Sequence, residues 1–245
     1  MKKLCIFDLD GTLASTLESM AVAANRVLRE MNLPEQPTES FKYFAGDGAK
    51  ELCRRCLRAA GDVECSQYEE MYRKYREYFS ETCMYKVVPY EGIPELLEKL
   101  KAAGIKISVL SNKPHAQAVD VVETLFGKGY FDAVQGQTDS VPRKPSPIGA
   151  NRLAEHFRAE KKDCLYIGDT ATDMETGKAA EMETVGVLWG FRDRKELEES
   201  KACHIAEKPE EIFFVKEILT FTEFWAHRKA PFWQIIPPVA LTSRG

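Results

Sequence analysis

The chain lacks a long apolar segment, a basic excess and a regular set of cysteines. No stretch of its 245 residues approaches the roughly 20 apolar residues of a transmembrane helix, so we expect no membrane partner. The formal net charge of −4 gives no electrostatic support for binding nucleic acid. Seven cysteines without a tidy spacing fit a reducing compartment better than a disulfide scaffold. Because the apolar residues after Lys2 and Lys3 meet Asp8 almost at once, we expect no signal peptide and interpret the protein as cytoplasmic.

Internal repeats and low-complexity tracts are also absent, and what the chain does contain is a recurring strand pattern. Three short apolar segments each stop at a polar position. They are residues 4–7 before Asp8, residues 105–110 before Ser111 and Asn112, and residues 164–167 before Gly168 and Asp169. A short apolar run that ends abruptly is typical of a parallel strand with both faces buried.

Helical patterns lie between these segments. Apolar residues recur at helical spacing from Ile93 to Leu100, before Gly104, and from Val119 to Phe126, before Gly127. Strands that alternate with helices predict an α/β fold, a doubly wound parallel sheet with a Rossmann-like core. In such sheets ligands bind at the carboxyl ends of the strands, so we expect the three polar endings to meet in one crevice.

The stretch from residue 17 to residue 86 shows amphipathic helices and no convincing strand. One of these helices has an apolar stripe that we interpret as packing against a core, and the stripe consists of Tyr68, Met71, Tyr72, Tyr75 and Phe79. We therefore predict an α-helical cap domain at 17–86, inserted into an α/β catalytic core at 1–16 and 87–220. Residues 221–245 break the α/β pattern and form a C-terminal tail whose role the sequence leaves open.

The predicted cap contains a CxxC pair, Cys53 and Cys56, followed by Cys65 and Cys83. Neither a regular spacing nor a second pair supports a zinc site. We interpret Cys53 and Cys56 as buried side chains of a helix.

Two pairs of aspartates follow the first and third apolar segments. Asp8 and Asp10 point to the same side, because side chains of a strand alternate with a period of two. Asp169 and Asp173 are neighbours if a helix begins there. About four negative charges in one crevice favour a divalent cation with oxygen ligands, such as Mg²⁺. Paired carboxylates also suit a division into a nucleophile and a general acid–base.

Residues of the opposite character follow the second segment. Lys144 supplies a cation, and Ser111 and Asn112 supply hydrogen-bond donors, which together suit phosphate oxygens. Each motif alone has a simpler explanation, since a DxD sequence is commonly a solvated turn, a GDxxxD sequence a helix cap and a lysine before proline a surface charge. Their joint occurrence at predicted strand ends argues against those explanations.

In order and spacing these motifs resemble those of the haloacid dehalogenase superfamily of phosphotransferases. The four motifs are DxDGT at Asp8–Thr12, Ser111 after an apolar strand, Lys144 before Pro145, and GDxxxD from Gly168 to Asp173. The resemblance covers about residues 1–220. It implies that Asp8 attacks phosphorus to give an aspartyl-phosphate and that Asp10 is the general acid–base.

The resemblance also implies a Mg²⁺ site and a phosphate-binding set. The resemblance assigns the metal to Asp8, the carbonyl of Asp10, and Asp169, with Asp173 as a further ligand or as a neighbour of the ligands. It assigns the phosphoryl group to Thr12, Ser111, Asn112 and Lys144, and it makes Lys144 a catalytic residue.

Within the superfamily, Asp10 argues against the dehalogenase and phosphonatase branches, which lack this second aspartate. The helical insert and the stretches SNKP, VPRKPSP and GDGAKEL look most like phosphoglycolate phosphatase. Lys50 and Lys113 would favour a substrate with a second anionic group, such as 2-phosphoglycolate, unless both lysines are solvated. We therefore predict a Mg²⁺-dependent phosphomonoesterase, monomer or homodimer, whose partner is a small phosphorylated metabolite. The alternatives are a sugar phosphomutase or pyrophosphatase of the same fold, and a binding protein without turnover.

Overall fold

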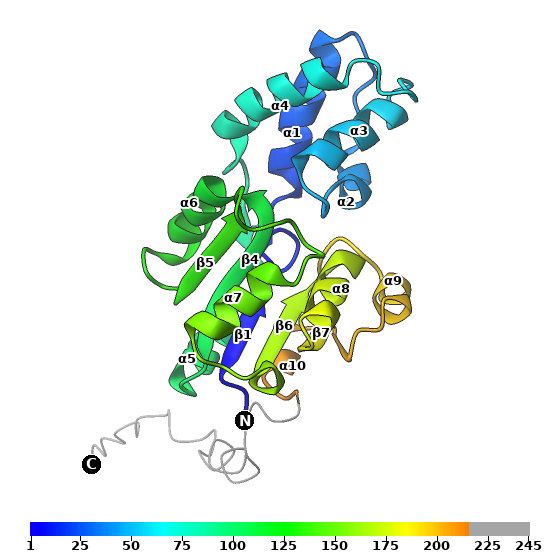
Figure 1. Ribbon diagram of the computed structural model, residues 1–245. Helices are drawn as coiled ribbons and strands as arrows, with labels where there is room; N and C mark the ends of the chain where they lie inside the picture. Colours follow the sequence, from blue (N-terminus) through cyan, green and yellow to red (C-terminus); the bar gives the residue numbers. More distant parts are fainter. Residues whose placement is uncertain (216–245) are drawn as a thin grey trace, which may run out of the picture.

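A parallel sheet forms the centre of the fold, as the alternating pattern predicts (Figure 1). The computed structural model describes residues 1–215, so the predicted tail at 221–245 lies outside the described residues. Within residues 1–215 the main sheet has six strands, which in spatial order are β5 (Ala133–Gln137), β4 (Lys106–Pro114), β1 (Leu4–Phe7), β6 (Cys164–Gly168), β7 (Glu183–Val187) and β8 (His204–Ala206). All neighbouring strands of this sheet are parallel, and β1 lies between β4 and β6.

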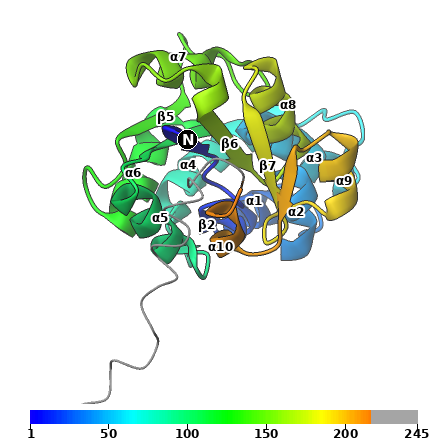
Figure 2. The ribbon, with the colours of Figure 1, turned by 90° about the horizontal axis from the view of Figure 1, so that it is seen from below.

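Helices cover both faces of the sheet, which confirms the doubly wound α/β fold (Figure 2). Because successive residues of β1 point to opposite faces, Phe7 packs in one apolar cluster with α5, α6 and α10, while Ile6 packs in another with α7 and the end of α8. The first face carries α5 (Ile93–Ala102), α6 (His115–Phe126) and α10 (Pro209–Ile212), and the second carries α7 (Ile148–His156) and α8 (Ala171–Ala179), with α9 (Arg194–Glu199) beside α8. Burial on both faces is the reason why every residue of β1 is apolar.

Strand β4 is longer than its apolar run predicts. The run covers residues 105–110, whereas the strand spans Lys106–Pro114 and includes Ser111 and Asn112. β5 pairs with β4 as far as Leu110, where the register shifts before pairing resumes at the last residue of the strand. β4 therefore continues through its polar residues because of backbone hydrogen bonds, which a pattern of hydrophobic residues does not predict.

Both predicted helix ends are confirmed. α5 ends shortly before Gly104, whose φ of +73° suits glycine, and α6 ends directly before Gly127. Within α6 the fully buried positions are Ala118, Val121 and Val122, so the buried face is displaced slightly from the predicted stripe that began at Val119.

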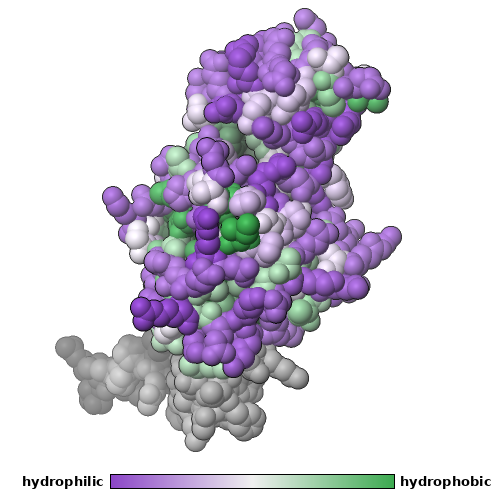
Figure 3. Space-filling view, in the orientation of Figure 1, coloured by the Kyte–Doolittle hydropathy of each residue, from purple (hydrophilic) through white to green (hydrophobic). Residues whose placement is uncertain are grey.

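A block of helices lies beyond the carboxyl ends of the strands and has a hydrophobic core of its own (Figure 1). Its α-helices are α1 (Leu17–Glu30), α2 (Phe41–Phe44), α3 (Ala49–Ala59) and α4 (Tyr68–Thr82), and a 3-10 turn at Thr38–Ser40 precedes α2. Of the stripe on α4, Met71, Tyr75 and Phe79 are buried in this core, whereas Tyr68 and Tyr72 are only partly buried against it. The outward side of the block is mostly hydrophilic in the space-filling view (Figure 3).

The chain enters and leaves this helical block through two short antiparallel strands, β2 (Ala14–Ser15) and β3 (Val88–Pro89). We propose that residues 17–86 form a cap domain and that residues 1–16 and 87–215 belong to the core, whose predicted end at 216–220 lies outside the described residues. The separate apolar cluster of the block supports this division. From here on, residues 17–86 are called the cap.

Cys53 and Cys56 lie fully buried in the apolar cluster of the cap, which confirms their interpretation as packed side chains. Burial raises the pKa of both thiols well above the ordinary value. Within residues 1–215 no helix is both long and apolar enough to cross a membrane.

Candidate active site

A cavity of about 820 Å³ lies between the cap and the carboxyl ends of the strands. The predicted site residues that line it are Asp8, Asp10, Ser111, Asn112, Lys113 and Lys144. Three further predicted residues are buried beside these, namely Thr12, Asp169 and Asp173. The polar endings of β1, β4 and β6 thus meet at one place.

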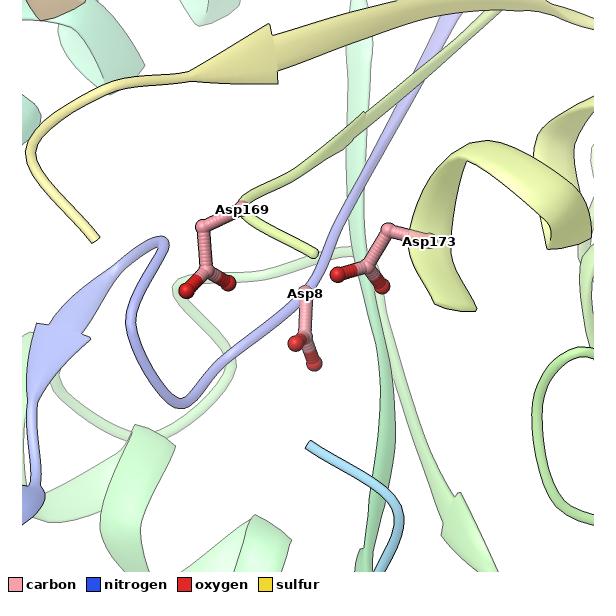
Figure 4. A group of neighbouring side chains, drawn as sticks. All are labelled: Asp8, Asp169 and Asp173. Atoms are coloured by element: carbon pink, nitrogen blue, oxygen red, sulfur yellow. The ribbon is translucent and has the colours of Figure 1, made fainter. Parts of the chain in front are cut away.

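Asp8 follows β1, and its carboxylate lies between Asp169 and Asp173 (Figure 4). Its Oδ1 atom accepts a hydrogen bond from the backbone N–H of Leu9 at 2.7 Å and lies 2.8 Å from Nζ of Lys144. Within residues 1–215 its Oδ2 atom has neither a hydrogen-bond partner nor an ion-pair partner. One oxygen is therefore held in place while the other remains available to a bound molecule.

Asp169 is held from two sides. Its Oδ1 atom accepts the hydroxyl of Thr12 at 3.0 Å, and its Oδ2 atom accepts the backbone N–H of Phe191 at 2.8 Å. The indole N–H of Trp189 donates to the carbonyl of Thr12 at 2.9 Å and so fixes that residue as well. Gly11, with φ +88°, leaves the necessary room, because a Cβ atom there would lie 2.2 Å from Asp169 Oδ2. Thr12, predicted to contact the phosphoryl group, thus donates its hydroxyl to Asp169.

Lys144 links Asp8 to Asp173. Its Nζ atom lies 2.8 Å from Asp8 Oδ1 and 2.7 Å from Asp173 Oδ1. The other oxygen of Asp173 accepts the hydroxyl of Thr170 at 2.7 Å and its backbone N–H at 3.2 Å, at the start of α8. Because both of its oxygens are engaged, Asp173 holds the ammonium of Lys144 next to Asp8.

The three carboxylates form a candidate metal centre. One oxygen each of Asp8, Asp169 and Asp173 lies within 4.8 Å of the others. Burial raises the pKa of Asp8 well above its ordinary value, with Lys144 opposing and Asp173 and Asp169 adding to the shift. Burial and then the charge of Asp173 raise the pKa of Asp169 to about 7. One lysine does not neutralise three buried carboxylates, and this set of oxygen donors fits a hard divalent cation.

Asp10 forms an ion pair with Lys113 at the cavity wall. The Nζ atom of Lys113 lies 2.8 Å from Asp10 Oδ1, and the lysine side chain is only 3% exposed. The ring of Phe79 from α4 lies 5.0 Å from the same ammonium. Lys113, expected beside the leaving group, therefore lines the cavity with Asp10 as its partner and is not solvated.

Ser111 and Asn112 offer different groups to a ligand. The hydroxyl oxygen of Ser111 accepts the backbone N–H of Lys113 at 3.2 Å, and within residues 1–215 its own O–H has no acceptor. Asn112 accepts the backbone N–H of Lys144 at 2.8 Å and donates to the carbonyl of Gly46 at 3.1 Å. Asn112, predicted to bind the phosphoryl group, thus ties the Lys144 loop to the cap.

Lys50 is the predicted site residue that the structure does not bring to the cavity. It is exposed on α3, and its ammonium lies 5.8 Å from the ring of Tyr72, outside the cavity lining. The face of α3 that lines the cavity contains Ala49 and Leu52. The next side chain along a helix is rotated by about 100°, so Lys50 cannot share the direction of Ala49. The structure thus corrects the expectation for Lys50.

Asp47, which no sequence pattern predicts as a site residue, joins the cap to the core. Its Oδ1 atom accepts the hydroxyl of Thr172 at 2.8 Å, and its carbonyl accepts a hydrogen bond from Arg143 at 2.7 Å. Each donor is the chain neighbour of a site residue, since Thr172 precedes Asp173 and Arg143 precedes Lys144. The stretches GDGAKEL and VPRKPSP contain Asp47 and Arg143, but no local pattern pairs residues that are 96 positions apart.

Asp47 is also paired within the cap, with the guanidinium of Arg55. Burial acts to raise the pKa of Asp47, but the Thr172 hydroxyl and the Arg55 charge outweigh it and lower that pKa below the ordinary value. The carboxylate form thus holds the cap against the core.

Replacing Thr172 by valine removes this hydroxyl and is expected to lower kcat/KM for phosphomonoesters about three- to tenfold. The loss corresponds to one hydrogen bond of about 1 kcal/mol that holds the cap over the site. Steady-state kinetics measures the effect, and the melting temperature should fall by no more than about 4 °C. Thr138→Val is the matched control, because that hydroxyl lies at the exposed surface near Ser140. An unchanged kcat/KM in Thr172→Val would contradict a catalytic role for this contact.

The chain matches the family model described as haloacid dehalogenase-like hydrolase over residues 5–187. It is 33% identical over 189 residues to a phosphoglycolate phosphatase of Aquifex aeolicus (strain VF5), an alignment that covers 77% of this chain and 86% of that protein. It is 29% identical over 202 residues to a phosphoglycolate phosphatase of Nitrosospira multiformis, with 80% of this chain and 88% of the relative covered.

A solved structure shares the fold. The crystal structure of a predicted phosphoglycolate phosphatase from Haemophilus somnus 129PT superimposes with a TM-score of 0.80 at 26% sequence identity. The match covers 87% of this chain and 97% of that one, so it includes the cap as well as the sheet.

Proposed function

Because the chain belongs to the haloacid dehalogenase-like hydrolases and is a phosphatase, we propose that it hydrolyses small phosphomonoesters through an aspartyl-phosphate on Asp8, with Mg²⁺ at the aspartate cluster. The observation that carries the proposal is the arrangement of Asp8. Its Oδ1 atom is held by Leu9 and Lys144, and its Oδ2 atom has no partner within residues 1–215. A carboxylate with one fixed and one uncommitted oxygen is placed for nucleophilic attack.

In the first step Asp8 Oδ2 attacks phosphorus, and the bond from phosphorus to the leaving oxygen breaks. Asp10, which lines the same cavity, donates a proton to that oxygen. In the second step a water molecule gives a proton to Asp10 and attacks phosphorus, so that the bond to Asp8 breaks and the carboxylate is regenerated. The ammonium of Lys113, 2.8 Å from Asp10 Oδ1, orients the carboxyl group for both transfers.

The remaining residues of the site stabilise charge. Lys144, between Asp8 and Asp173, offsets negative charge that builds up beside the attacked phosphorus, and the free O–H of Ser111 donates to a phosphoryl oxygen. Asp8 and Asp169 would hold Mg²⁺, together with the Asp10 carbonyl, while Asp173 is committed to Lys144 and Thr170. Bound there, the cation would neutralise the phosphoryl oxygens and orient them for in-line displacement.

We further propose that 2-phosphoglycolate is one of the substrates. Relatives of this chain carry the name phosphoglycolate phosphatase, and Lys113 lines the cavity near the catalytic aspartates in addition to Lys144. A second anionic group on the substrate is therefore favoured electrostatically.

The test compares 2-phosphoglycolate with ethyl phosphate, which has the same carbon count and no carboxylate. With Mg²⁺ present, kcat/KM for 2-phosphoglycolate is expected to be at least about tenfold higher, a difference of about 1.4 kcal/mol. Release of inorganic phosphate gives both rates. Equal efficiency toward the two compounds would remove 2-phosphoglycolate from the proposal and leave the phosphatase class intact.

A further inference from the structure

The cavity extends from Asp8 along one face of α4. Besides the buried Tyr75 and Phe79, the α4 residues that line it are Glu69, Tyr72, Arg73, Arg76, Glu77 and Ser80. Their spacing of three or four positions places them on a single side of the helix, next to the buried face that contains Phe79. The cap therefore presents an elongated polar wall to the space beside the catalytic aspartates.

The position of Phe79 shows which end of this wall is catalytic. Its ring lies 5.0 Å from the ammonium of Lys113, and that ammonium binds Asp10. Each helical turn toward the N-terminus of α4 moves about 5.4 Å away from this end. Arg76 is about one turn away and Tyr72 about two turns away.

Arg76 is a cation without a partner on this wall. Arg73 lies 3.9 Å from Glu77, whereas Arg76 has no ion pair within residues 1–215. Its guanidinium lies 5.7 Å from the ring of Tyr72, a contact that leaves the N–H groups free. A guanidinium fork of this kind pairs in bidentate fashion with a carboxylate or a phosphate.

The space between the two ends suits a carbon chain. Apolar side chains from other elements, Met20 of α1, Leu52 of α3 and Ala116 of α6, line the same cavity. A volume of about 820 Å³ is in the range of pockets for drug-sized ligands. In 2-phosphoglycolate the carboxylate lies directly beside the phosphate, so the compound leaves the far end of the cavity empty.

We propose that Arg76 and Tyr72 form a distal anion subsite, which makes phosphomonoesters with an extended leaving group and a terminal carboxylate or phosphate better substrates than 2-phosphoglycolate. This inference rests on the proposed phosphomonoesterase activity. Four to six carbons, counted from the ester oxygen and including the carboxyl carbon, would span roughly one turn of α4.

The test uses ω-carboxyalkyl phosphates of two to six carbons, beginning with 2-phosphoglycolate, each compared with the n-alkyl phosphate of equal length. A parallel series of alkanediol bisphosphates distinguishes a terminal phosphate from a terminal carboxylate. The kcat/KM ratio of charged to uncharged compound is expected to peak at roughly four to six carbons. Arg76→Met should reduce the peak ratio by at least about tenfold, and Arg76→Lys should restore part of it.

Two controls separate this role from a structural one. The melting temperature of Arg76→Met should equal that of the wild type, which shows that the cap remains folded, and the n-alkyl phosphates supply the baseline of each ratio. Arg58→Met removes an exposed cation from the same cap, outside the cavity lining, and it should leave every ratio unchanged.

Calorimetric binding of the corresponding non-hydrolysable ω-carboxyalkyl phosphonates tests the subsite without turnover. The phosphonates of four to six carbons are expected to bind with the lowest Kd, and Arg76→Met should raise the Kd of these compounds by at least about tenfold. If no phosphate ester is hydrolysed but the phosphonates show this pattern, the proposed function fails and the subsite stands. If affinity and kcat/KM are highest at two carbons, or if Arg76→Met changes neither of them, the proposal of a distal subsite is wrong.

Discussion

Replacing Asp8 by asparagine is expected to abolish phosphatase turnover while leaving the fold at least as stable. The amide cannot attack phosphorus, so the loss should be on the order of 10⁴- to 10⁶-fold. Asp10→Asn should lose less, roughly 10² to 10⁴-fold, which is the usual contribution of general acid–base catalysis. Release of inorganic phosphate, together with trapping of a phosphorylated protein in the wild type, provides the measurement.

The stability half of this prediction follows from the surroundings of Asp8. Burial raises the pKa of its carboxyl, and the charges of Asp173 and Asp169 add to the shift, so the ionised form is unfavourable in the folded, metal-free protein. The asparagine side chain removes that charge, and the metal-free melting temperature should be unchanged or higher. The exposed Asp139 supplies the control, since Asp139→Asn should change neither activity nor stability. More than a few per cent of wild-type turnover in Asp8→Asn would rule out the covalent mechanism.

Removing the divalent cation is expected to have a comparably large effect. Excess chelator should abolish turnover and Mg²⁺ should restore it, whereas Ca²⁺ should restore it poorly because it takes more and longer oxygen bonds. Asp169→Asn should raise the Mg²⁺ concentration for half-maximal activity by at least about tenfold. Titration of activity with each cation provides the measurement, and full activity in excess chelator would exclude the scheme.

The metal also has an effect that is independent of activity. The pKa of Asp169 is about 7 in the folded protein, against about 3.9 for an unfolded chain. Because the folded pKa is raised, the metal-free protein should lose stability as the pH rises from about 4 to about 7. At pH 8, Mg²⁺ at 100 times its Kd should stabilise the wild type by about 2.7 kcal/mol. Thermal unfolding should show a much smaller Mg²⁺ effect in Asp169→Asn, and an equal effect in both proteins would place the metal elsewhere.

Much of the site was predictable because its groups are tied to strand ends. Asp8, Ser111 and Asp169 each follow an apolar run, and parallel strands direct their carboxyl ends to one edge of the sheet. Asp8 and Asp10 line one cavity as predicted, although β1 ends at Phe7 and both aspartates lie in the segment that follows it. Local patterns of this kind need no knowledge of the tertiary structure.

Predictions that depended on the direction of a single side chain were less successful. The charge of Lys50 favours it as a site residue, but the orientation of α3 directs it outward. The apolar stripe of α4 does not indicate that Arg76, which lies outside it, lines the cavity. Which of two adjacent helical residues reaches a site depends on the rotation of the helix about its axis, and packing against other elements sets that rotation.

The sequence by itself determined three strands of the sheet, their alternation with helices and the candidate carboxylates that follow the first and third strands, because periodicity and motif spacing are local properties. Only the tertiary structure decided which hydrogen-bond donor or ion-pair partner each of these carboxylates has. Thr12 donates to Asp169 across 157 positions, and Lys113 pairs with Asp10 across 103. Contacts at such separations arise when the sheet assembles and the cap packs over it, and no pattern within a short window records them.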